Sequence, residues 1–114
     1  MVTSLDTLAE FDAFVHQHLA AAVYFGGAHC GVCRALWPKL EARLAAVFPQ
    51  LALAYVEVGQ AQALAAACNV FTVPVIAVHF EGREWVRRAG AFALAELERD
   101  IARPYAMLFG EADA

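Results

Sequence analysis

Two cysteines, Cys30 and Cys33, lie at a predicted junction between a strand and a helix. An apolar stretch, residues 20–25, precedes them, and a stretch with helical periodicity, residues 34–48, follows them. Unpaired N–H groups and the positive end of the dipole at a helix N-terminus stabilise a thiolate, and the first cysteine is the one exposed to them. One helical turn also brings the two sulfurs within bonding distance. The spacing therefore predicts a reversible dithiol.

A metal site is an alternative use of the same residues. His29, Cys30 and Cys33 would supply three ligands, but tetrahedral zinc needs a fourth, and Cys68 belongs to a different predicted helix end. We therefore expect no metal within one chain, whereas two chains that share a metal or cluster would escape this objection. A buried pair without redox function is a further alternative.

Periodicity and turn residues divide the chain into alternating helices and strands. Thr7 and Glu10 match a capping box at the start of the first helix. The predicted helices cover residues 7–18, 34–48 and 60–68 and begin again at residue 94, and the predicted strands cover residues 20–25, 51–58, 75–80 and 84–89. The short turn at residues 81–83 requires the last two strands to be antiparallel.

Two prolines fall inside predicted helices. Pro38 predicts a kink, and Pro104 predicts that the last helix ends or bends there. Residues 110–114 are expected to be loose. Helices between the early strands call for right-handed crossovers and a sheet covered on both faces. The predicted fold is α/β with a central mixed sheet, in one domain over residues 1–114.

The composition argues against several classes of protein. A net charge of -4 with only 8 Lys and Arg residues disfavours nucleic-acid and anionic-membrane partners. Three cysteines are too few for a secreted disulfide framework. The N-terminal residues lack the basic and apolar segments of an export signal, and no uncharged run reaches the length of a membrane span. We expect a cytoplasmic protein.

Four features at fixed spacing give the chain a resemblance to the thioredoxin family over nearly its whole length. They are the Cys30–Cys33 motif after an apolar strand, Pro38 five residues past the second cysteine, the Val73–Pro74 pair before the hairpin, and Gly90 after it. The resemblance implies a thioredoxin-like fold and thiol–disulfide oxidoreductase activity. It also implies that Cys30 attacks a substrate disulfide and that Cys33 resolves the mixed disulfide.

The resemblance further implies a substrate groove and a set of partners. Pro74 would follow a cis peptide bond, and Val73 would offer backbone groups to a bound peptide. The implied groove residues are His29, Val73, Pro74, Gly90 and Ala91. Substrates would be protein disulfides or small oxidised thiols, and the electron donor a flavoprotein thioredoxin reductase or glutathione. The Cys30/Cys33 pair would be the redox centre, without an organic cofactor or metal.

The residues around the motif depart from the family pattern. His29 replaces the usual Trp, and Val32 replaces the usual Pro. The Val32 N–H and a protonated His29 would both stabilise a Cys30 thiolate, which predicts a more oxidising pair than in a typical thioredoxin.

The proton-transfer residues of the family are also replaced. Tyr24 takes the place of its buried acid, and Tyr55 that of the lysine often paired with it. Tyrosine is a poor base at neutral pH, so Cys33 has no evident general base unless Glu57 or an ordered water reaches it. A module that binds a client protein or peptide in its apolar groove, with the cysteine pair structural or only occasionally redox-active, is therefore the competing interpretation.

The remaining conspicuous side chains have structural interpretations. Cys68 is expected to be a small core residue at a helix end, and Arg87 and Arg88 to be solvated residues of an edge strand. We expect three histidines at the surface or at helix ends: His16, His18 and His79.

Overall fold

The computed structural model describes residues 2–110, in which the predicted order of helices and strands is confirmed and one strand is added at the start. The elements in chain order are β1 (Val2–Ser4), α1 (Leu8–Gln17), β2 (Ala20–Gly26), α2 (Gly31–Val47), β3 (Ala52–Glu57), α3 (Gln62–Ala67), β4 (Val75–Phe80), β5 (Arg83–Ala89) and α4 (Leu94–Phe109). The expectation for residues 111–114 lies outside the described part of the chain.

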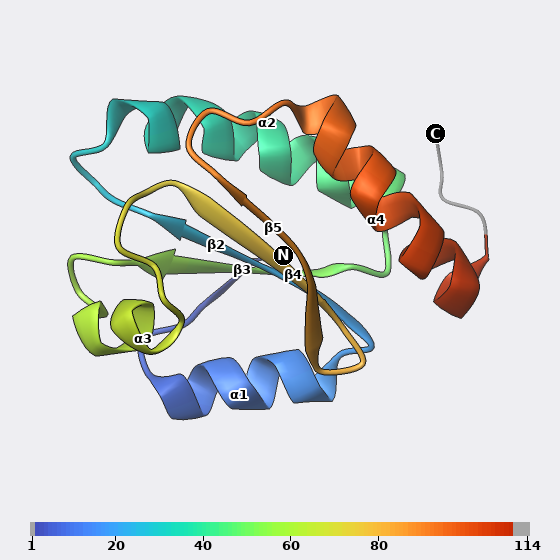
Figure 1. Cartoon of the computed structure of the whole chain (residues 1–114), viewed down its shortest axis with the longest axis horizontal. Coiled ribbons are helices and arrows are strands. Elements are labelled where there is room, and N and C mark those ends of the chain that lie inside the picture. Colours follow the sequence, from blue (N-terminus) through green and yellow to red (C-terminus); the bar gives the residue numbers. More distant parts are fainter. Residues whose placement is uncertain (1, 111–114) are drawn as a thin grey trace.

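The five strands form one mixed sheet in the order β1-β3-β2-β4-β5 (Figure 1). Strands β1, β3 and β2 are parallel, whereas β4 is antiparallel to β2 and to β5. The predicted hairpin at residues 81–83 is therefore confirmed. β2 lies at the centre, and its carboxyl end leads directly into α2, at the left of Figure 1.

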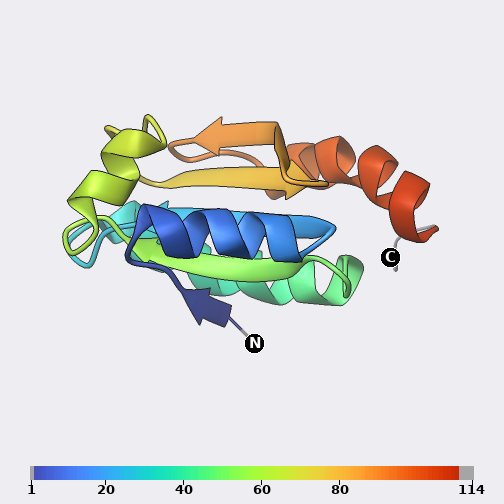
Figure 2. The ribbon, with the colours of Figure 1, turned by 90° about the horizontal axis from the view of Figure 1, so that it is seen from below.

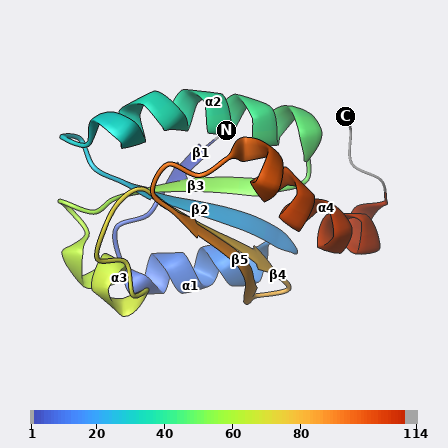
Figure 3. The same cartoon turned by 45° about the horizontal axis from the view of Figure 1, so that its top comes forward.

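Helices cover both faces of the sheet, as Figures 2 and 3 show from two further directions. One core lies between the sheet and α1 with α3, and the other lies between the sheet and α2 with α4. The helical side chains that fill the first core include Phe11, Phe14, Val15, Leu64 and Ala65. Those that fill the second include Leu40, Leu44, Leu97, Ile101 and Tyr105. This matches the predicted three-layer architecture.

The short strand β1 is absent from the sequence-based prediction. It pairs in parallel with β3, with Val2 opposite Leu53 and Ser4 opposite Tyr55, and it is three residues long. Its side chains are exposed or only partly buried. Such a short edge strand is defined by backbone pairing with a distant segment, and it has no apolar periodicity of its own.

The first helix starts where its capping residues predict. The Thr7 hydroxyl accepts a hydrogen bond from the Glu10 N–H at 3.1 Å, and the Glu10 carboxylate accepts one from the Thr7 N–H at 3.1 Å. Backbone hydrogen bonds from Asp6 and Thr7 lower the pKa of Glu10. The capping box is thus confirmed.

The two proline predictions have different outcomes. Pro38 lies inside α2 as expected, and the predicted kink there stays a prediction. Pro104 does not end the last helix, because α4 continues to Phe109, and the alternative outcome, a bend at Pro104, stays a prediction. Tyr105 explains this, since its side chain is buried and its hydroxyl accepts a hydrogen bond from the Gln50 N–H at 3.0 Å. Tertiary packing of the last turns outweighs the loss of one helical hydrogen bond.

The expectation that His79 lies at the surface is wrong. Its side chain is only 6% exposed, because β4 lies between β2 and β5 and every residue of β4 is buried. His79 alternates with Val75 and Ala77, which belong to the core beneath α1. Its Nδ1 atom is buried without a hydrogen-bond partner among residues 2–110.

Within residues 2–110, no helix has the length and hydrophobicity of a membrane span.

Candidate active site

Cys30 is the N-cap of α2, and Cys33 lies in the first turn of that helix. A turn closed by the Cys30 N–H and the Gly27 carbonyl, 3.1 Å apart, carries the chain from β2 to this cap. The Cα atoms of Cys30 and Cys33 are 5.3 Å apart, and their sulfurs form a disulfide. The predicted position of the pair between a strand and a helix is confirmed.

The Cys30 sulfur occupies the place of an N-cap side-chain acceptor. Its Sγ accepts a hydrogen bond from the Cys33 N–H at 3.2 Å. The sequence pointed instead to the Val32 N–H as the donor. An N-cap side chain bonds to the second or third N–H of the helix, and here the third, from Cys33, is the one used.

The two cysteines differ in exposure. Cys30 is partly exposed, whereas Cys33 is 1% exposed. A disulfide in solution can therefore approach the Cys30 side chain more easily, because the Cys33 side chain is shielded from solvent. Of the two cysteines, Cys30 is thus the one more accessible to solvent.

An aromatic cluster of buried Tyr24 and partly buried Trp37 and Tyr55 lies next to Cys33. Tyr24 is fully buried in β2, and its hydroxyl donates a hydrogen bond to the Cys33 carbonyl oxygen at 3.2 Å. Trp37 stacks on Tyr24 at 4.8 Å between ring centroids and meets the edge of Tyr55 at 5.3 Å. Burial, followed by the nearby Tyr55, raises the pKa of Tyr24 to about 12. Tyr24 is therefore a hydrogen-bond donor here and not a base.

Glu57 is the other acidic candidate that the sequence raises. Its carboxylate accepts a hydrogen bond from the Gly59 N–H at 3.2 Å. The neighbouring Tyr55 has a pKa raised by burial and then by the charge of Glu57. The Glu57 carboxylate thus accepts a hydrogen bond within its own turn, and its charge acts on Tyr55.

The loop before β4 lies against the dithiol. The Val73–Pro74 peptide bond is cis, as the resemblance implies. A Cβ atom placed on Gly27 would lie 3.7 Å from the Cys30 Cβ and 3.8 Å from the Val73 Cγ2. Gly27 is thus the point at which the cysteine turn and the Val73 side chain meet.

Gly90 connects the end of the hairpin to the same loop. Its N–H donates a hydrogen bond to the Pro74 carbonyl oxygen at 2.9 Å. Gly90 has a φ of 72°, in the left-handed region that favours glycine. Ala91 follows it at the surface, and His29 is exposed beside Cys30. The predicted site residues therefore surround one end of the sheet.

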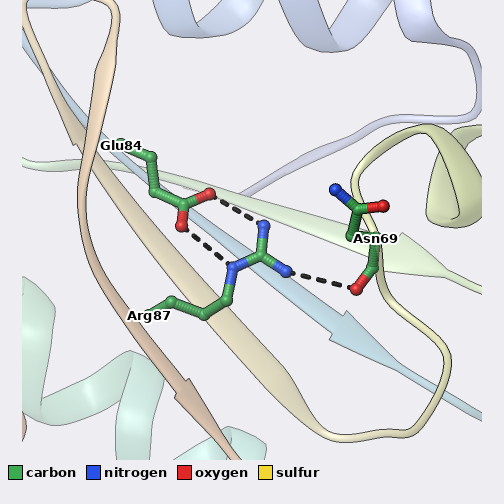
Figure 4. A network of polar contacts seen from close by, with 3 residues as sticks. All are labelled: Asn69, Glu84 and Arg87. Atoms are coloured by element: carbon green, nitrogen blue, oxygen red, sulfur yellow. Dashed lines mark hydrogen bonds and ion pairs between the residues drawn. The ribbon is translucent and has the colours of Figure 1, made fainter.

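Arg87 of the edge strand β5 pairs with Glu84 of the same strand and also contacts the loop at Asn69, as Figure 4 shows. The Arg87 guanidinium donates two hydrogen bonds to the Glu84 carboxylate, at 2.9 and 2.8 Å, and a longer one of 3.5 Å to the Asn69 carbonyl oxygen. Arg88 pairs in turn with Asp100 of α4. Arg87 and Arg88 are therefore engaged with carboxylates, which the sequence did not indicate.

A shallow pocket of about 250 Å³ extends from the cysteine turn along α2. Its lining residues are Val32, Ala35, Leu36, Lys39, Ala91 and Phe92. Of these, only Ala91 belongs to the groove that the sequence predicted. The remaining residues were missed because the pocket forms between the outer side of α2 and the segment after β5, which are distant in sequence.

Among residues 2–110, no three His, Cys, Asp or Glu side chains are grouped closely enough to hold a metal ion.

Cys68 is a free cysteine at the C-cap of α3, half-buried against the core beneath α1. Its expected role as a small packing residue fits this position.

Comparisons with known proteins match this architecture. The family model named Thioredoxin matches residues 2–103. The thioredoxin-like protein YdfQ of Bacillus subtilis is 31% identical over 110 residues, which cover 96% of this chain and 97% of that protein.

Solved structures agree with the sequence comparison. Fasciola hepatica thioredoxin is 29% identical with a TM-score of 0.79, over 89% of this chain and 97% of that one. Mitochondrial thioredoxin 3 of Saccharomyces cerevisiae, in its oxidised form, is 25% identical with a TM-score of 0.79, over 88% and 92%. The chain belongs to the thioredoxin family, and its fold and paired cysteines are those of a thiol–disulfide oxidoreductase.

Proposed function

We propose that Cys30 is the nucleophile and Cys33 the resolving thiol in the reduction of protein disulfides. The unequal exposure of the pair carries this proposal, since Cys30 is partly exposed and Cys33 is 1% exposed. The position of Cys30 at the helix N-terminus supports it, because the Cys33 N–H and the helix dipole both stabilise negative charge on the Cys30 sulfur.

The reaction proceeds in two exchanges. The Cys30 thiolate attacks one sulfur of the substrate disulfide, forms a mixed disulfide and releases the other substrate sulfur as a thiolate. Cys33 then gives its proton to water, and its thiolate attacks the Cys30 sulfur. The Cys30–Cys33 disulfide forms, and the second substrate thiolate leaves. Two electrons pass from the dithiol to the substrate, and the disulfide is the form in this structure.

We propose that a bound peptide lies across His29, Val73, Pro74, Gly90 and Ala91. The contact of Gly27 with both the Cys30 turn and Val73 supports this placement, as does the hydrogen bond from Gly90 to Pro74. No cofactor beyond the disulfide, and no metal, takes part in the proposed exchange.

The proposed setting is the cytoplasm, where a flavoprotein thioredoxin reductase or glutathione would reduce the pair again. Residues 1–114 would act as one domain, which the two cores that share one sheet support. Small oxidised thiols are secondary substrates in this proposal.

Reduction of insulin disulfides tests the assignment. The wild-type chain with dithiothreitol as electron donor is expected to accelerate precipitation of the insulin B chain. Cys30→Ser is expected to abolish the acceleration, because the attacking sulfur is gone. Cys33→Ser is expected to accumulate a mixed disulfide with insulin, visible by mass spectrometry without reductant.

Cys68→Ser serves as the matched control, because it removes a thiol outside the site and is expected to leave the rate unchanged. A folded wild-type chain that fails to reduce insulin would contradict the proposal. If that chain and Cys30→Ser still bound a reduced client equally well, the peptide-binding module would replace it.

A further inference from the structure

The pocket beside the cysteine turn has an apolar end and a basic end. Val32, Ala35, Leu36 and Lys39 follow one another at helical spacing on one side of α2, opposite Ala91 and Phe92. Val32, 49% exposed and two residues from Cys30, is at the end next to the dithiol. Lys39 lies seven residues further on, at the end away from it.

Lys39 carries the charge at this far end. It is exposed, and among residues 2–110 no carboxylate lies within ion-pair distance of it. The next cation on the helix, Arg43, is held by Glu98 of α4 at 2.8 Å. Among the described residues, Lys39 is therefore the one charged side chain in the lining of this pocket, on a chain whose net charge is -4, and Glu41, two residues further along α2, does not pair with it.

We propose that this pocket is a substrate subsite for a client polypeptide with an apolar residue beside its disulfide cysteine and an acidic residue further along. The apolar side chain packs on Val32, Leu36 and Phe92, and the carboxylate pairs with Lys39. The inference rests on the proposed disulfide reduction at Cys30, because the cysteine of the client fixes the register of its other residues.

The dimensions of the pocket set the spacing. Seven residues of helix between Val32 and Lys39 span about 10.5 Å along the axis. An extended peptide advances about 3.3 Å per residue, so the acidic residue is expected about three residues from the one that contacts Val32. The volume of about 250 Å³ suits one apolar side chain, with the charged group at the rim.

Four model peptides test the subsite. Each contains one cysteine in a disulfide with a fluorogenic thiol and a leucine next to it. The charged position, about three residues beyond the leucine, is Glu or Lys. It lies N-terminal to the cysteine in one pair of peptides and C-terminal in the other, because the strand direction is not fixed by the pocket.

The wild-type chain is expected to reduce a Glu peptide about twofold to fivefold more efficiently, by kcat/KM, than its Lys counterpart in at least one direction. Lys39→Glu is expected to reverse that order. Added salt is expected to weaken the preference between Glu and Lys peptides in both proteins, because the interaction between residue 39 and the peptide charge is exposed to solvent. A general loss of stability would lower all four rates together and would not reverse the order.

Arg83→Glu is the matched control, because it changes the net charge equally. Arg83 is exposed at the start of β5, whereas the segment beside the pocket follows the end of that strand. This variant is expected to keep the wild-type order. Equal rates for Glu and Lys peptides in both directions, or an order that Lys39→Glu leaves unchanged, would overturn the subsite. A chain that reduces none of the four peptides would contradict the dithiol chemistry itself, and the subsite with it.

Discussion

The Tyr24 hydroxyl donates a hydrogen bond to the Cys33 carbonyl oxygen, 3.2 Å away, from the central strand into the first turn of the active-site helix. The bond joins β2 to the residue that is proposed to resolve the mixed disulfide. Its acceptor is a backbone atom and its donor has a pKa raised to about 12. Tyr24 is therefore suited to position Cys33 and unsuited to accept its proton.

Tyr24→Phe tests this positioning role. The free energy of unfolding is expected to fall by about 1 kcal/mol, because the Cys33 carbonyl loses a buried donor. The pH dependence of peptide reduction between about pH 6 and pH 9 is expected to keep its shape, since Tyr24 stays protonated throughout this range. Urea unfolding and a kcat/KM profile measure the two effects.

Tyr55→Phe is the matched control for Tyr24→Phe, because Tyr55 belongs to the same aromatic cluster. The described hydrogen bond to Cys33 comes from Tyr24. The control is expected to lose less stability. If Tyr24→Phe removed an ionisation from the profile, Tyr24 would be a proton acceptor and the positioning role would be wrong.

Arg87→Met tests the contact between Arg87 of the edge strand β5 and the Asn69 carbonyl of the loop that leads to Val73. The pair with Glu84 is partly exposed, so the free energy of unfolding is expected to fall by about 1 kcal/mol or less. Amide hydrogens of residues 69–73 are expected to exchange faster, because the Asn69 carbonyl loses its contact with the guanidinium.

Glu84→Gln provides the comparison for Arg87→Met. It removes the carboxylate partner and leaves the Arg87 contact with Asn69 in place. Loop exchange is expected to stay close to the wild-type rate. Equal acceleration in both variants would show that the ion pair, and not the bond to Asn69, holds the loop.

Cys68 is expected to react slowly with alkylating reagents. Burial raises the pKa of its thiol, and the charge of Arg87 opposes this effect. In the reduced protein near pH 7, iodoacetamide is expected to modify Cys30 faster than Cys68, by about tenfold or more. Peptide mapping by mass spectrometry measures both rates. Modification of Cys68 before Cys30 would contradict the assignment of the reactive thiol.

The cysteine pair is predictable from sequence because its chemistry is local. Cys30 and Cys33 belong to one helical turn next to an apolar strand, whereas Val73, Pro74 and Gly90, distant in sequence, were expected only from the resemblance to the thioredoxin family. The disulfide, the N-cap position and the cis peptide bond all appear in the structure. The roles of the groove residues stay predictions.

The features that sequence could not give depend on contacts between distant segments. β1 exists through its pairing with β3, and the last turns of α4 through the burial of Tyr105. The pocket that includes Lys39 needs α2 and the segment after β5 together. The burial of His79 follows from the place of β4 inside the sheet, which the strand order decides.

His79 lines a cavity of about 280 Å³ on the side of the sheet that α1 covers. The Phe11 ring meets it edge-on at 5.5 Å between centroids. Burial lowers the pKa of His79, while Glu84 acts in the opposite direction and Arg87 and His16 act in the same direction as burial. The folded protein therefore prefers the neutral imidazole.

We predict that His79 makes the fold sensitive to acid. Below about pH 6.5 the unfolded chain binds a proton at this residue that the folded chain resists, so stability is lost as the pH falls toward the lower folded pKa. His79→Phe is expected to remove this loss and to add about 1 kcal/mol at pH 8, because the unpartnered Nδ1 is gone and the cavity accommodates the larger ring. Urea unfolding at pH 8 and pH 5 measures both effects, and His18→Gln, an exposed histidine, is the control. An equal loss of stability in wild type and His79→Phe between these pH values would show that other groups cause the sensitivity.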